Sequence, residues 1–75
     1  MTDAEALALA DKVDIWIVSG EEAGAMRTLR EALGLCLGRG PSAKLFRPGG
    51  FGDQAVWIDA AQAARLHDQL MQAAA

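Results

Sequence analysis

The stretch VDIWIVS, from Val13 to Ser19, decides the fold of this chain. Aliphatic residues recur in it at every second position, which is the period of a β-strand with two different faces. One face would carry Val13, Ile15 and Ile17, and the other Asp14, Trp16 and Val18. Residues 19–22, Ser-Gly-Glu-Glu, then match a capping box, in which Ser and Glu satisfy the first backbone N–H groups of a helix. The pattern therefore predicts a strand that turns directly into a helix.

A similar stretch, VWID from Val56 to Asp59, stands near the other end of the chain. It predicts a strand over 54–58, paired as a hairpin with a strand over 43–47 through the glycine-rich connector at 49–53. Asp59 is placed to cap a final helix, with Gln62 at the third helical position. The apolar stripe of that helix is Ala63, Leu66 and Leu70.

Two more helices are predicted from caps and periodicity. Thr2 and Glu5 form a capping box for a short helix over 3–10. The long helix expected after Ser19 has an apolar stripe made of Met26, Leu29, Leu33 and Leu37. We expect this helix to end near Gly38. Gly34 is the alternative end, and residues 35–37 would then form a short strand.

These elements define an α+β class: a small two-layer domain of order (α)βαββα, with a three-stranded sheet and both long helices on one face. The 75 residues make one domain, 1–75. Apolar residues are 52% of the chain, but 16 of them are alanine. A chain of this length buries roughly 60% of its unfolded surface, and alanine adds little to that burial. The composition therefore excludes a large enclosed active site and makes an isolated monomer marginal.

The two tryptophans mark the predicted binding surface. If the branched aliphatic residues point under the helices, Trp16 and Trp57 lie on the opposite face of the sheet. Aromatic side chains are enriched at interfaces, and an uncovered sheet face with two indoles is unfavourable in water. We therefore expect Trp16, Trp57, Val18 and Ala55 to contact a protein partner, and a homodimer is the simplest form. The alternative is that the indoles fill the core and the aliphatic residues face outward.

Charge is distributed unevenly along the chain. The net charge is −3, with −5 in residues 1–22, +4 in residues 23–50 and −2 in residues 51–75. The basic segment resembles a weak surface for anions or nucleic acid, made of Arg39, Lys44, Arg47, Phe46 and Phe51. Nucleic acid is the less favoured partner because the chain as a whole is not basic. A solvated basic face is the other interpretation.

No residue pattern in the chain predicts catalysis. The one cysteine, Cys36, and the one histidine, His67, give no metal-ligand spacing, and no hydroxyl is placed as a nucleophile beside His67. We expect no metal, no cofactor and no enzymatic activity. The function predicted is that of a protein-binding module: a small regulator, inhibitor or assembly factor, of which a phage-type inhibitor of a bacterial complex is one form.

The chain also lacks the patterns of exported and membrane proteins. Its first residues are acidic where a signal peptide is basic, and no uncharged stretch approaches the ~20 residues that span a bilayer. We expect a cytoplasmic protein with no membrane partner. The excess of arginine over lysine and the many alanines are typical of high-GC bacterial or phage genes.

Overall fold

Seven helices and strands make up the fold in a computed structural model, which describes residues 1–49 and 54–74. In chain order they are α1 (Asp3–Ala8), β1 (Val13–Val18), β2 (Ala25–Thr28), α2 (Leu29–Gly38), β3 (Leu45–Arg47), β4 (Val56–Ile58) and α3 (Ala60–Ala74). The predicted α+β class is confirmed. The prediction of three strands is wrong, because the sheet has a fourth strand, β2.

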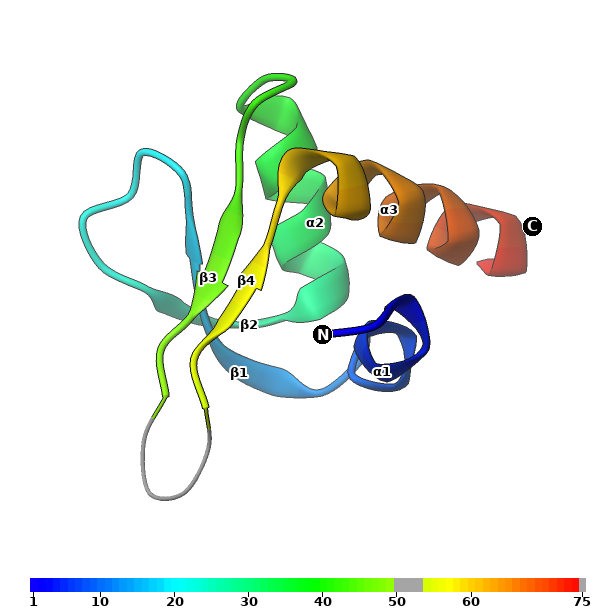
Figure 1. The fold of residues 1–75 in the computed structure, drawn as a ribbon, viewed down its shortest axis with the longest axis horizontal. Coiled ribbons are helices and arrows are strands. Elements are labelled where there is room, and N and C mark those ends of the chain that lie inside the picture. The colour runs from blue at the N-terminus through cyan, green and yellow to red at the C-terminus, as the bar shows by residue number, and fades with distance from the viewer. Residues whose placement is uncertain (50–53, 75) are drawn as a thin grey trace.

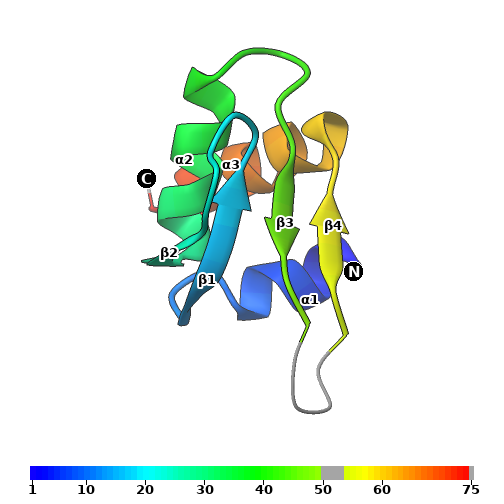
Figure 2. The same cartoon turned by 90° about the vertical axis from the view of Figure 1, so that its left-hand side faces the viewer.

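The sheet is antiparallel throughout, in the order β2-β1-β3-β4. The three helices of the described residues lie on one side of the sheet, and none of them lies on the other face (Figure 1). Seen from that bare side, the four strands stand in front of all three helices (Figure 2). We call this bare side the outer face of the sheet. The two predicted layers are therefore present: the sheet is one layer, and the helices that pack on its inner face are the other.

Strand β2 lies where the sequence predicted the first turns of the long helix. Helix α2 begins only at Leu29, with Thr28 as its cap. The Glu31 backbone N–H donates to Thr28 Oγ1 at 3.2 Å, and the Glu31 carboxylate accepts from Thr28 in return. Thr28–Glu31 is thus the capping box that starts this helix. The helix ends at Gly38, as predicted, and Gly34 lies inside it.

Residues 19–22, which were predicted to cap a helix, start no helix and lie instead in the connection between β1 and β2. Ser19 ties β1 to the start of β3, because its hydroxyl accepts from the Lys44 backbone N–H at 2.8 Å. Gly20 has a φ of 93°, a left-handed conformation that suits glycine, and the Glu21 N–H donates to the Val18 carbonyl at 3.0 Å. The chain therefore turns back at this point to form the β1–β2 hairpin.

The other two predicted caps are confirmed. Thr2 and Glu5 bond reciprocally at the start of α1. The Gln62 backbone N–H donates to Asp59 Oδ1 at 2.7 Å at the start of α3. Each cap needs only residues three positions apart, so local sequence is sufficient to specify it.

The core lies between the sheet and the helices, and it reverses the predicted orientation of β1. Trp16 is 1% exposed and Val18 is equally buried, whereas Val13 and Ile15 are exposed. In β4 the prediction is confirmed: Ile58 is buried and Trp57 is 65% exposed. Register explains the difference, because Val18, Leu45 and Ile58 pair across three strands and share the inner face. Trp16, two residues from Val18 on the same strand, follows it inward.

Candidate protein-binding surface

Six apolar side chains from all four strands stand together on the outer face. They are Val13, Ile15, Ile17, Met26, Phe46 and Trp57, and we call them the outer-face cluster. The register brings them together, because Ile15 pairs with Met26, Ile17 with Phe46 and Phe46 with Trp57. Ile17 and Phe46 are half-buried and the other four are exposed. The cluster therefore forms one continuous apolar strip across the sheet.

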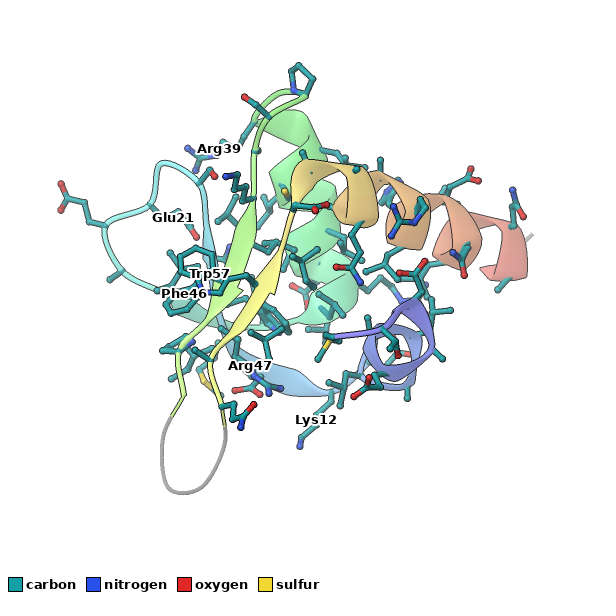
Figure 3. The ribbon with its side chains drawn as sticks, in the orientation of Figure 1. Lys12, Glu21, Arg39, Phe46, Arg47 and Trp57 are labelled. Carbon is teal, nitrogen blue, oxygen red and sulfur yellow. The ribbon has the colours of Figure 1, made fainter. Side chains whose placement is uncertain are left out.

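The two aromatic members of this cluster pack on each other. The ring centroids of Phe46 and Trp57 are 4.2 Å apart and the ring planes are inclined by 30°. Both rings point away from the helices (Figure 3). Stacking restricts the rotamers of both side chains, so the pair is a pre-ordered apolar contact point.

A shallow groove of about 200 Å3 runs beside this aromatic pair. It is lined by Phe46 and Trp57, and by Ser19, Gly20 and Glu21 at the start of the β1–β2 connection. Ile17 and Lys44 also contribute. The groove is mostly apolar, with one acidic and one basic side chain at its border, which suits an apolar side chain of a protein partner.

The β1–β2 connection is held in place against the strip. A Cβ at Gly24 would lie 2.6 Å from Ile15 Cγ2 and 3.0 Å from Ile17 Cγ1, so the backbone there lies directly on the two isoleucines. The Glu21 carboxylate accepts from the Val18 backbone N–H at 2.9 Å and pairs with Arg27 at 3.0 Å. The bond from Arg27, and then the one from Val18, hold the pKa of Glu21 below its ordinary value. The part of the β1–β2 connection that lines the groove is therefore ordered in the unbound chain.

The predicted anion or nucleic-acid residues do not form one surface. Lys44 and Phe46 line the groove, and exposed Arg39 lies near Gly20 beside it. Arg47 lies on the inner face, where its guanidinium carbon is 5.9 Å from the centre of the Trp16 ring and its Nη1 is 3.5 Å from Asp14. Phe51 lies outside the described residues.

Of the four predicted interface residues, two are exposed and two belong to the core. Trp57 and Ala55 are exposed, so their contact with a partner stays a prediction. Trp16 and Val18 belong to the core, and the prediction that they face outward is wrong. Sequence reasoning placed Val13, Ile15 and Ile17 in the core and Met26 in a helix, and so missed four members of the cluster. The alternative, in which the indoles fill the core, is confirmed for Trp16 in β1 and wrong for Trp57 in β4.

The groups considered for chemistry are dispersed. Cys36 is buried in α2, and this burial raises the pKa of its thiol. His67 is half-buried on α3. Among residues 1–49 and 54–74, no three His, Cys, Asp or Glu side chains come close enough to hold a metal ion.

Comparisons of the chain with protein-family models, curated proteins and solved structures find no significant match. Within the described part of the chain, none of the helices has the length and apolar character to cross a membrane. No residue is therefore assigned a role by comparison, and the function of the outer face is inferred from the side chains that form it.

Proposed function

We propose that this chain is a non-catalytic protein-binding module that acts by covering a protein surface with the outer face of its sheet, and that its partner is a second copy of the chain. The observation that carries the proposal is the outer-face cluster. Its six apolar side chains form a strip on a sheet face on which the described part of the chain places no helix (Figure 2). Contiguous apolar patches of this kind on small proteins mark interaction sites.

Covering the apolar side chains of this face would contribute free energy to association. Burying one exposed side chain of the size of Met26 or Trp57 contributes roughly 1.5–3 kcal/mol. Four strands at a spacing of about 4.8 Å make the face about 20 Å wide, and its length falls from about 20 Å at β1 to about 10 Å at the three-residue strands β3 and β4. A stable dimer buries roughly 800 Å2 on each partner. The face, with a projected area below roughly 400 Å2, is smaller than this, so the contact between two copies would have to extend over the rim of the sheet and the neighbouring connections.

A second copy also matches the chemistry of the face. Two sheets pack face to face about 10 Å apart. If the two-fold axis runs parallel to the strands, β2 of one copy crosses β4 of the other, and Met26 meets the Phe46–Trp57 pair. Sulfur–aromatic contacts are favourable. The rim carries both signs of charge, with Glu21 and Lys44 at the groove. Two copies can therefore pair without bringing together rims of a single sign of charge.

The test is the molar mass in solution, measured by sedimentation equilibrium from micromolar to millimolar concentration. We expect the mass of two chains, and the mass of one chain for Met26→Lys. The matched control is Met71→Lys, because Met71 on α3 is 60% exposed and Met26 is 66% exposed. Circular dichroism checks that each variant is folded. A wild-type monomer at every concentration, or equal dissociation by both substitutions, contradicts self-association through this face.

A further inference from the structure

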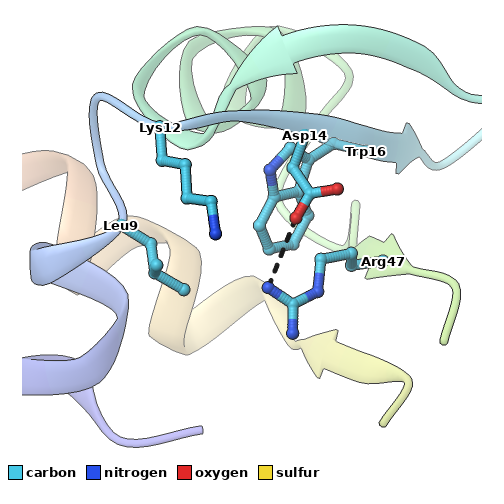
Figure 4. Close-up of a pocket in the computed structure, with 5 residues that line it drawn as sticks. All are labelled: Leu9, Lys12, Asp14, Trp16 and Arg47. Atoms are coloured by element: carbon cyan, nitrogen blue, oxygen red, sulfur yellow. Dashed lines mark hydrogen bonds and ion pairs between the residues drawn. The ribbon is translucent and has the colours of Figure 1, made fainter. Parts of the chain in front are cut away.

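A second cleft lies on the opposite side of the sheet, where α1 leads into β1. It is lined by Leu9, Lys12, Asp14, Trp16 and Arg47 (Figure 4). Alternation along β1 places Asp14 and Trp16 on the inner face, away from the outer-face cluster. This cleft is therefore independent of the surface proposed for protein binding.

The indole nitrogen of Trp16 makes this cleft unusual. Trp16 is 1% exposed, and its Nε1 is buried with no hydrogen-bond partner among the described residues. An indole N–H can only donate, and a buried donor without an acceptor is unfavourable. In Figure 4 this nitrogen is on the side of the ring nearer Lys12. The cleft thus holds a donor that needs an acceptor.

The charged side chains of the cleft offer more donors than acceptors. Asp14, the one carboxylate among the described residues that line the cleft, already accepts from the Ile15 backbone N–H at 2.8 Å and from Arg47 Nη1 at 3.5 Å. The Arg47 bond is long, and a guanidinium has five N–H donors. The Lys12 ammonium forms no ion pair with any carboxylate in the described part of the chain. Two cations and one anion leave a formal charge of +1 beside the indole N–H.

We propose that this cleft binds a phosphate-type oxyanion. The donors are Lys12 in the α1–β1 connection, the Trp16 indole N–H on β1 and Arg47 on β3, and a tetrahedral oxyanion has enough oxygens to accept from all three. A carboxylate, with two oxygens and about four acceptor sites, could also accept from three donors, but a phosphate has more oxygens, arranged as a tetrahedron, and a larger negative charge. Arginine and lysine are the side chains that recognise phosphate oxygens, by planar N–H pairs and by point charge respectively.

An anion larger than water can occupy this cleft only if a lining side chain moves, and Lys12 is the exposed side chain among those that line it. About 150 Å3 of empty space lies among the lining side chains, part of it open to solvent, and no pocket within it is wide enough for a whole water molecule. Lys12 is exposed and has a flexible stem, so it can swing outward and close over a bound anion.

The test observes the indole N–H signals by nitrogen–proton correlation NMR. Trp57→Phe identifies which of the two signals belongs to Trp16. Sodium phosphate is added at constant ionic strength, with sodium chloride as the compensating salt. We expect a saturable shift of the Trp16 signal and no saturable shift of the Trp57 signal. A Trp16 signal that does not move, or that moves linearly without saturation, overturns the proposal.

Two variants of equal charge change locate the site. Lys12→Ala should weaken phosphate binding about tenfold or more, as expected for loss of a charge-assisted hydrogen bond. Lys44→Ala, which removes an exposed lysine on the outer face, should leave the affinity unchanged. Equal weakening by both variants means non-specific attraction and contradicts the site. Acetate, added in a parallel titration, should bind more weakly than phosphate, and equal affinity would overturn the assignment to a phosphate-type ligand.

Discussion

Phe46 and Trp57, on neighbouring strands, stack with their ring centroids 4.2 Å apart on the outer face of the sheet, opposite the three helices of the described residues (Figure 1). Directly paired residues on antiparallel strands are close enough for such contact. The pair lines the groove together with Glu21, which Arg27 holds by an ion pair. These lining side chains are therefore ordered by contacts within the chain, which reduces the entropy lost when a partner binds.

Trp57 should report the proposed self-association directly. In a Trp16→Phe background, where Trp57 is the only indole, we expect its emission to move to shorter wavelength and its quenching by acrylamide to fall as protein concentration rises. The reason is that the dimer removes this 65% exposed side chain from water. Adding Met26→Lys should restore the exposed spectrum at all concentrations. Quenching that is independent of concentration would speak against the dimer.

The two tryptophans should differ in their effect on stability. Trp16→Ala removes a buried side chain from the core and should lower the free energy of unfolding by about 3–5 kcal/mol. Trp57→Ala removes mainly a stacking contact and should lower it by about 0.5–1.5 kcal/mol. Urea denaturation at a low protein concentration, where a dimer is dissociated, measures both. Equal losses would contradict the assignment of Trp16 to the core and Trp57 to the surface.

Alanine should have opposite effects at two glycines. Gly24→Ala places a Cβ 2.6 Å from Ile15 Cγ2 and should destabilise the chain by about 1–3 kcal/mol, as overpacking does. Gly34 lies inside α2 with open space around it, so Gly34→Ala should stabilise by about 1 kcal/mol through helix propensity. Urea denaturation of both variants checks the pair. A Gly24→Ala variant as stable as wild type would mean that the β1–β2 connection does not rest on Ile15.

Acid should destabilise the chain partly through Glu21. Hydrogen bonds from Arg27 and the Val18 N–H lower the pKa of Glu21 in the folded state. Its contribution to stability is therefore present above the unfolded value, about 4.3, and is lost as the pH falls through the lower folded pKa. Glu21→Gln should flatten this part of the stability–pH profile. Glu22→Gln, with the same charge change at an exposed neighbour, should leave the slope unchanged, and a similar flattening by both would assign the effect to net charge.

Nucleic acid provides a separate test of the basic segment. Arg47 faces the core side and Lys44 faces the groove, so the two cations cannot contact one strand together. We expect no retardation of single-stranded DNA in a gel at low salt. Retardation that falls steeply with added salt and is lost in Lys44→Ala would instead favour the nucleic-acid function.

Local patterns determined much of this fold. The boxes at Thr2 and Thr28 and the cap at Asp59 each join residues three positions apart, so their helices begin where short segments of sequence specify. The capping box at Thr28 and Glu31 is visible in the sequence. However, Met26, Leu29 and Leu33 have helical spacing, and this spacing predicts a helix that begins before Thr28. This spacing is the reason that β2 was not predicted.

The sequence by itself determined the caps at Thr2 and Asp59, the α+β class and the inward direction of Ile58, because these depend on neighbouring residues or on one clearly apolar position. Only the tertiary structure decided which face of β1 is buried. Both faces of that strand are apolar, so its own pattern gives no strong preference. Pairing of Val18 with Leu45, and through it with Ile58, settles the choice and takes Trp16 into the core. The isoleucines are left outside, and the surface that we propose for binding is therefore a product of register.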